Sequence, residues 1–216
     1  MDCGIIDTDQ SVLYIEVIVT KQKRSLETRN HILDSALNCF SKNGYDATGV
    51  AEICGAAGVS KGAFYHHFPT KQAVFLALLN DWLGGLEETL LIIIKEAETV
   101  PEAFDNMAGM AQQIFTVAKG KIPMFLEFWI QARRDPIIWE ATIEPYRRYQ
   151  NIFTKLIQEG IDEGTIQANN PEDVARIIVS FAVGLLLQGA LDPDSADWGD
   201  ILIQGIHVLI SGVKIK

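Results

Sequence analysis

Apolar and polar positions follow a helical period along most of the chain. Between Ser25 and Asn43 apolar residues recur every three or four positions, and Gly44 follows where a helix would end. The apolar face of this predicted helix contains Ile32, Leu33, Ala36, Leu37 and Phe40. Residues 12–19 differ, because they form the only run rich in β-branched residues, and we predict a strand-like segment there.

Two short helices and one long helix follow. Thr48 is placed to cap the first helix, which ends at Gly58, and Ser60 opens the second. Thr70 caps the long helix, whose apolar face extends to Leu90. We expect this long helix to link two domains.

Prolines mark helix starts in the rest of the chain, because a proline in the first turn removes an N–H that has no partner there. These prolines are Pro101, Pro123, Pro136 and Pro171. Pro145 either begins another helix or kinks the one that begins at Pro136. Two strongly apolar helices, at about 172–191 and 197–213, close the chain. The pattern predicts an all-α fold.

The two short helices have the spacing of a helix-turn-helix motif. Such a motif needs a small residue where the helices touch, a glycine that can adopt positive φ, and an apolar anchor on the second helix. Cys54, Gly58 and Phe64 meet these needs. Small, basic and hydrogen-bonding residues then face outward and suit a DNA major groove: Ser60, Lys61, Gly62, Ala63, Tyr65, His66 and His67, with Lys71 just beyond. A helical hairpin with incidental polar exposure remains the alternative.

Residues 48–53, 57–68 and 70–71 resemble the DNA-binding signature of the tetracycline-repressor (TetR) family. The resemblance covers roughly residues 25–75, and the downstream layout of about six helices ending in an apolar pair is also similar. It implies a homodimeric, one-component transcriptional regulator, usually a repressor that leaves its operator when a small molecule enters the C-terminal domain. The sequence departs from the family pattern at Cys54, where alanine is usual, and at Gly55, where a charged residue is common.

The same resemblance implies roles for individual residues of the motif. The base-facing positions fall to Lys61, Gly62 and Ala63. The phosphate-facing positions fall to Thr48, Tyr65, His66 and Lys71.

The charge of the chain is unevenly distributed around a net value of −10. Residues 21–72 hold seven Lys and Arg against four Asp and Glu, whereas residues 73–216 hold 11 against 20. A basic segment joined to an acidic body suggests a nucleic-acid-facing module. We therefore expect a DNA-binding domain at 23–72 and an effector-binding and dimerisation domain at 73–216. Residues 1–22 would be an extension: a disordered arm, an extra strand, or an artefact of an upstream start codon.

The second predicted domain contains two apolar features with separate interpretations. A concentration of large side chains could line a cavity for an apolar or aromatic effector; the candidates are Met107, Met110, Phe125, Phe128, Trp129 and Tyr146. The two closing helices carry more apolar surface than one inward face requires, which indicates a dimer interface; the candidates are Phe181, Leu185, Leu186, Ile203, Ile206 and Leu209. Ordinary core packing is the alternative for both sets.

Other chemistry finds little support in the sequence. The three cysteines form an odd set without C-x-x-C spacing, so we expect buried, reduced thiols rather than disulfides or a metal site. No catalytic residue set has workable spacing, and we expect no cofactor. The start of the chain is acidic and no segment is apolar enough to span a membrane, which predicts a cytoplasmic protein. A helical-bundle enzyme and a protein-binding scaffold remain as alternative functions.

Overall fold

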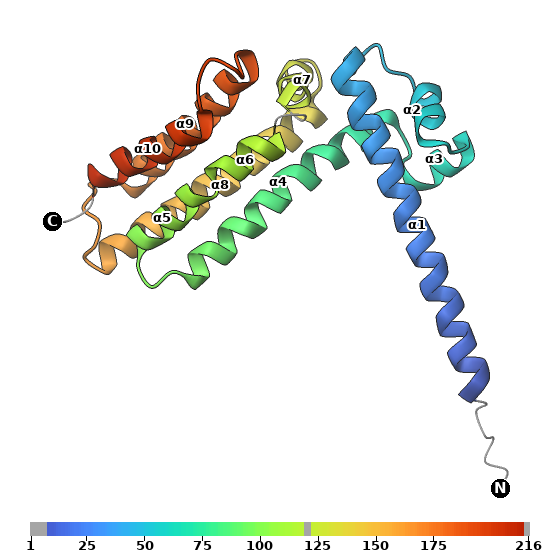
Figure 1. Ribbon diagram of the computed structural model, residues 1–216, viewed down its shortest axis with the longest axis horizontal. Helices are drawn as coiled ribbons and strands as arrows, with labels where there is room; N and C mark the ends of the chain where they lie inside the picture. Colours follow the sequence, from blue (N-terminus) through green and yellow to red (C-terminus); the bar gives the residue numbers. More distant parts are fainter. Residues whose placement is uncertain (1–7, 119–121, 214–216) are drawn as a thin grey trace, which may run out of the picture. The chain divides into compact units, whose positions relative to one another are not determined.

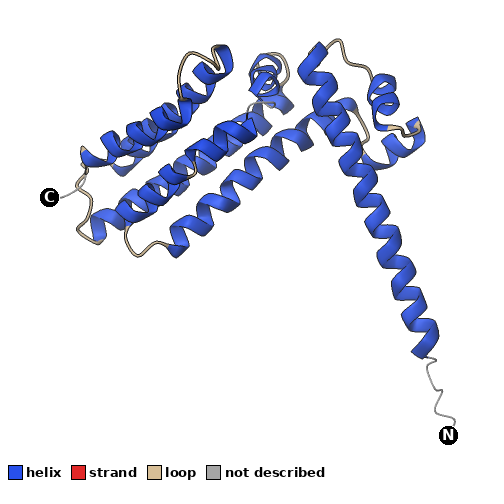
Figure 2. Ribbon diagram, in the orientation of Figure 1, coloured by secondary structure: helices blue, strands red, loops and turns tan. Residues whose placement is uncertain are grey.

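The computed structural model describes residues 8–118 and 122–213, without the side chains of residues 8–19, 117, 118, 122, 123, 125 and 190. Ten helices and no strand occur in these described ranges (Figures 1 and 2), which confirms the predicted all-α fold. The chain divides into two compact units, Met1–Phe75 and Leu76–Lys216. We call them the N-terminal unit and the C-terminal unit.

Helix α1 (Thr8–Asn43) begins far earlier than the sequence predicts. It includes residues 12–19, so the predicted strand is wrong, and residues 8–22 are helical rather than a disordered arm. A strand needs a neighbour to pair its N–H and C=O groups, and the described part of the chain offers none. A helix pairs these groups within the segment, which outweighs the β propensity of the residues. Gly44 follows α1 with a φ of 80°.

The helix-turn-helix consists of α2 (Val50–Ala57) and α3 (Lys61–His67). Gly58 ends α2 in the left-handed conformation, with a φ of 65°, as the motif requires. Ser60 caps α3, because its Oγ accepts a hydrogen bond from the Ala63 N–H at 3.1 Å. The predicted Thr48 cap of α2 is wrong, because Gly49 holds the N-cap position and makes no side-chain cap.

The core of the N-terminal unit joins α1, α2, α3 and the start of α4 (Lys71–Glu96). The Phe40 and Phe75 rings meet nearly at right angles, with centroids 5.5 Å apart. The buried residues include Ile32, Leu33, Ala36, Phe40, Ile53, Phe64, Phe68, Val74 and Phe75. Cys39 and Cys54 are also buried, as free thiols, and burial raises the pKa of Cys39.

The C-terminal unit continues α4 with six further helices. These are α5 (Val100–Gly109), α6 (Ala111–Ala118), α7 (Ile122–Ala132), α8 (Pro136–Asp162), α9 (Pro171–Leu191) and α10 (Trp198–Ser211). The four predicted prolines each occupy the first or second position of a helix. Pro145 lies inside α8, so it begins no new helix. None of the described helices has both the length and the apolar character needed to cross a membrane.

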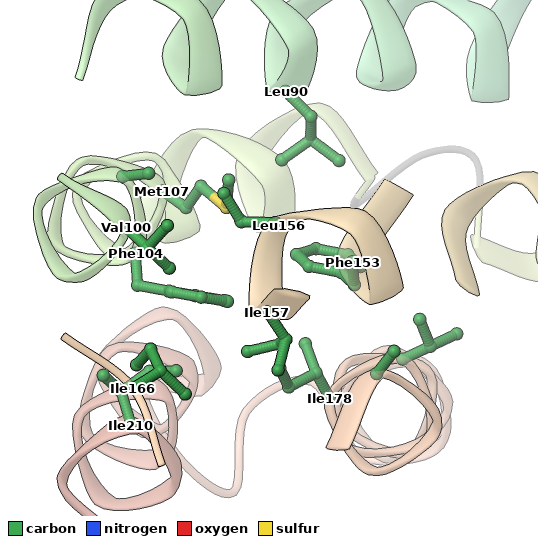
Figure 3. Close-up of a cluster of buried hydrophobic side chains, with 13 residues drawn as sticks. Leu90, Val100, Phe104, Met107, Phe153, Leu156, Ile157, Ile166, Ile178 and Ile210 are labelled. Carbon is green, nitrogen blue, oxygen red and sulfur yellow. The ribbon is translucent and has the colours of Figure 1, made fainter. Parts of the chain in front are cut away.

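Two buried clusters hold the C-terminal unit together. The larger one draws side chains from α4, α5, α8, α9 and α10, and Figure 3 shows α5 and α8 side chains converging there. Its Phe104 and Phe153 rings stack with centroids 6.1 Å apart. The smaller cluster forms around Ala111, Leu185 and Leu202. Gly205 of α10 lies against the Phe181 ring beside it, with no space for a methyl group.

Candidate nucleic-acid interface and ligand site

Helix α3 presents a polar face above a single fully buried anchor. Phe64 is 0% exposed, whereas Tyr65 is 53% exposed. Lys61, Gly62 and His66 are also exposed, and Ala63 is half-buried. One large apolar residue thus fixes a short helix while its neighbours keep their side chains in solvent. The structure brings these predicted base-facing and phosphate-facing residues onto one helix.

The small size of Gly62 is not required by packing inside the chain. A Cβ placed there would meet only Ser60 Oγ, at an ordinary 3.7 Å. Alanine would stabilise a helix at this position by roughly 1 kcal/mol. A glycine on an exposed face leaves space for another molecule to approach the backbone closely.

Thr48 and Lys71 hold the segment that leads into the motif. The buried Thr48 hydroxyl is 2.8 Å from the Gly44 carbonyl and 3.2 Å from the Cys39 carbonyl, so it donates inward. Lys71 Nζ donates to the carbonyls of Tyr45 at 2.6 Å and Thr48 at 2.9 Å, and lies 4.2 Å from the centroid of the Tyr45 ring. These contacts favour positioning roles over the phosphate contacts expected for both residues.

The two histidines at the end of α3 differ in their surroundings. Their rings meet edge to face with centroids 5.1 Å apart. His66 is exposed, whereas His67 is half-buried. Burial, followed by the influence of His66 and Arg29, lowers the pKa of His67. A lowered pKa favours the neutral imidazole near pH 7, so His67 adds no positive charge to this face.

The predicted effector residues are only partly brought together. Trp129 and Tyr146 meet edge to face, with ring centroids 6.1 Å apart. Tyr146 also packs against the large cluster that contains Met107. Phe128 is fully buried, and Met110 is half-buried at the end of α5. The Phe125 side chain lies outside the described residues.

The Tyr146 hydroxyl is the unusual polar group of this region. Its oxygen is buried, and no described group is placed to accept a hydrogen bond from it. Burial raises the pKa of Tyr146, and hydrogen bonding with the Trp129 indole opposes that shift. The phenol therefore keeps its hydrogen at neutral pH. A buried hydroxyl whose hydrogen has no acceptor is uncommon and needs an explanation, which a hydrogen-bond acceptor on a ligand would supply.

Sequence reasoning missed a polar connection between α4 and α8. The Tyr149 hydroxyl donates to the Leu83 carbonyl at 2.6 Å. Arg148 donates to Glu87 at 2.9 Å and also pairs with Glu144. Only the Arg148–Glu144 pair could be predicted from the local sequence, because the two residues are four apart on one helix. The contacts to α4 join residues 61 or more positions apart, which no local pattern reveals.

Several of the predicted interface residues belong to the core of their own chain. Leu185 is 5% exposed, and Phe181 packs beside Gly205. Leu186 is half-buried. Ile203, Ile206 and Leu209 are half-buried and pack on the two clusters. The exposed apolar residues of these helices are instead Ile177, Leu191 and Val208. Helical periodicity identified apolar positions but could not assign each one to an inner or an outer face.

Comparison with protein families gives two matches along the chain. Residues 32–78 match the model described as bacterial regulatory proteins of the tetR family. Residues 116–202 match the C-terminal region of BetI-type transcriptional repressors. An HTH-type transcriptional repressor from Mycobacterium tuberculosis is 35% identical over 172 residues, which cover 77% of this chain and 84% of that protein.

Solved structures share the fold at lower identity. The regulator FadR from Bacillus subtilis, in complex with stearoyl-CoA, is 22% identical with a TM-score of 0.72, and covers 84% of this chain and 97% of its own. A transcriptional regulator from Saccharomonospora viridis, in complex with choline, is 17% identical with a TM-score of 0.75, and the match covers 88% and 99% of the two chains. Together with the helix-turn-helix geometry, these matches show that the chain belongs to the TetR family of bacterial transcriptional regulators.

Proposed function

We propose that this regulator represses transcription by placing α3 of each subunit in the major groove of operator DNA. Lys61 would bind bases, the small Gly62 and Ala63 would allow close approach, and Tyr65 and His66 would bind phosphates. The observation that carries this proposal is the exposed polar face of α3 above the buried Phe64. Its groups are available to a partner without unfolding the motif. No catalytic step is part of this function.

A comparison of two alanine variants tests the role of α3. Lys61→Ala should weaken binding to a selected operator by about 1 to 3 kcal/mol and relax base preference, because its contact would be to a base edge. Lys155→Ala is the matched control, since Lys155 is also exposed but lies on α8. Titration of operator and random duplex by fluorescence anisotropy measures both effects. Equal changes in operator affinity and in base preference for the two variants would contradict the proposal.

The proposed effector is a small molecule with a largely apolar or aromatic body. The Trp129–Tyr146 ring pair supports this class. The Tyr146 hydroxyl, whose hydrogen has no acceptor among the described residues, supports one hydrogen-bond acceptor on the ligand. The acidic balance of residues 73–216 disfavours polyanions. A thermal-shift panel of neutral aromatic ketones, choline and stearoyl-CoA tests the assignment. Stabilisation by stearoyl-CoA alone would contradict it.

Release of the operator requires reciprocal coupling between the two ligands. Operator DNA should weaken effector binding by the factor by which effector weakens DNA binding, commonly 1 to 3 kcal/mol. Calorimetric titration of a thermal-shift hit, with and without operator, measures this factor. Equal affinity in both titrations would reject effector-controlled release even if both ligands bind.

We also propose that the regulator is a homodimer joined through α9 and α10. The exposed apolar residues Ile177 and Val208 support this surface, because they contribute little to their own chain's core. Val208→Asp should therefore give a folded monomer. Ile137→Asp, an equally apolar exposed site on α8, should remain a dimer. Sedimentation distinguishes these results, and a monomeric wild type at micromolar concentration would contradict the proposal.

A further inference from the structure

Two turns of α1 are exposed to solvent in the described part of the N-terminal unit. Every residue from 20 to 27 is exposed, including the apolar Leu26, which is 60% exposed. The first buried side chain of α1 in the described part of the chain is Ile32. A helix exposed on all sides gains little stability from burial. We call residues 20–27 the exposed α1 segment.

The exposed α1 segment is strongly basic. It contains Lys21, Lys23 and Arg24, against the single acid Glu27. No ion pair among the described residues involves any of the three cations. Their helical spacing places Lys21 and Arg24 on neighbouring positions of one face and Lys23 on another. Three like charges within one turn repel one another, and a polyanion beside the helix would relieve that repulsion.

The exposed α1 segment extends from the point where α1 contacts the end of α3, the helix that reads DNA in the proposed function. The Arg29 guanidinium lies 5.3 Å from the centroid of the Phe68 ring, and Phe68 caps the C-terminal end of α3. Because α1 rises about 1.5 Å per residue, Arg24 and Lys21 lie roughly 7 and 12 Å further along its axis. Figure 1 shows α1 continuing well past α2 and α3 within this unit.

We propose that the exposed α1 segment is a second DNA-binding surface, which contacts backbone phosphates outside the groove occupied by α3. This inference rests on the proposed function, because α3 brings the duplex to this side of the unit. Lys21, Lys23 and Arg24 would neutralise phosphates and release counterions, which adds affinity without adding base preference. The surface thus has a role distinct from that of Lys61.

A triple substitution, Lys21→Gln, Lys23→Gln and Arg24→Gln, tests this surface. Glutamine has nearly the same helix propensity as lysine and arginine, and all three sites are exposed, so the fold should persist. Binding to a random-sequence duplex of roughly 30 base pairs, about three helical turns, is measured at several salt concentrations. The slope of log affinity against log salt should decrease by about 3 to 5 per dimer. The ratio of operator to random affinity should remain unchanged.

A charge-matched control separates this surface from the total charge of the protein. The substitutions Lys95→Gln, Arg133→Gln and Lys155→Gln remove three exposed cations from the C-terminal unit and should leave the slope unchanged. An unchanged slope in the α1 variant, or an equal decrease in the control, would overturn the inference while the proposed function stands. Failure of the wild type to bind either operator or random duplex would overturn both. Binding of the wild type to anionic vesicles but to neither duplex would also overturn both the inference and the proposed function.

Discussion

The N-terminal and C-terminal units place their candidate functional groups at different depths. In the N-terminal unit, Lys61 and Tyr65 are exposed above the fully buried Phe64. In the C-terminal unit, Met107 belongs to the main buried cluster and Tyr146 packs against it. A substitution at an exposed position leaves the packing of the core that holds it unchanged. A substitution within a core disturbs that packing, so one near the proposed effector site should change stability and ligand binding together.

The largest expected effect comes from removing the anchor of α3. Phe64→Ala should destabilise the N-terminal unit by about 3 to 5 kcal/mol, because it leaves a cavity at a fully buried site. DNA binding should be lost. All four tryptophans lie in the C-terminal unit, so their fluorescence reports that unit. An unchanged tryptophan unfolding transition would support separate cores, whereas a parallel loss would show that the two units unfold together.

Gly205→Ala tests how tightly the C-terminal core is packed. A methyl group at this position would overlap the Phe181 ring, so we expect a loss of about 1 to 3 kcal/mol. Denaturant unfolding measures the change. Phe181→Leu in the same chain should recover part of the loss, since the two sites are in contact. The matched variant Gly184→Ala has open space around its Cβ and should not be destabilised.

Lys71 and Lys61 provide a comparison within one unit. Lys71→Met should cost about 1 to 3 kcal/mol of stability, because two carbonyls lose a charged donor. Lys61→Met should have little effect on stability, because Lys61 is exposed. Base preference in DNA binding should respond in the reverse order, because Lys61 is the proposed base contact. A decreased salt slope in folded Lys71→Met would instead restore the phosphate role expected from the sequence.

The smallest expected effect is the loss of folding stability at high pH caused by the tyrosines Tyr146 and Tyr149. Burial raises the pKa of both Tyr146 and Tyr149. A raised folded-state pKa gives stability that is present below the unfolded pKa, about 10, and is lost as pH rises above it. Stability should therefore fall above pH about 10, and less so in Tyr146→Phe.

At neutral pH, Tyr149→Phe should cost about 1 kcal/mol of stability, because the Tyr149 hydroxyl donates to the Leu83 carbonyl. Denaturant titrations at both pH values measure these changes.

Local signals predicted the helices and the motif well, because Gly58, Ser60 and Pro171 act within a few residues of their own position. Local signals fail where the outcome depends on distant partners. Residues 12–19 are helical because the described part of the chain offers no neighbouring strand, and the burial of Leu185 depends on side chains from other helices. The inward hydrogen bonds of Thr48 and Lys71 depend on how the chain folds back around Tyr45, which periodicity cannot show.

The burial of Cys39 and Cys54 has a practical consequence for measuring local opening. Cys39 and Cys54 lie in the N-terminal unit, and both are buried in the folded state. A thiol reagent can therefore modify them only when this unit opens, since the reactive thiolate is also disfavoured at the buried Cys39. The rate of thiol labelling would therefore measure how often the helix-turn-helix unit opens. Operator DNA should lower this rate, because it binds the closed form alone.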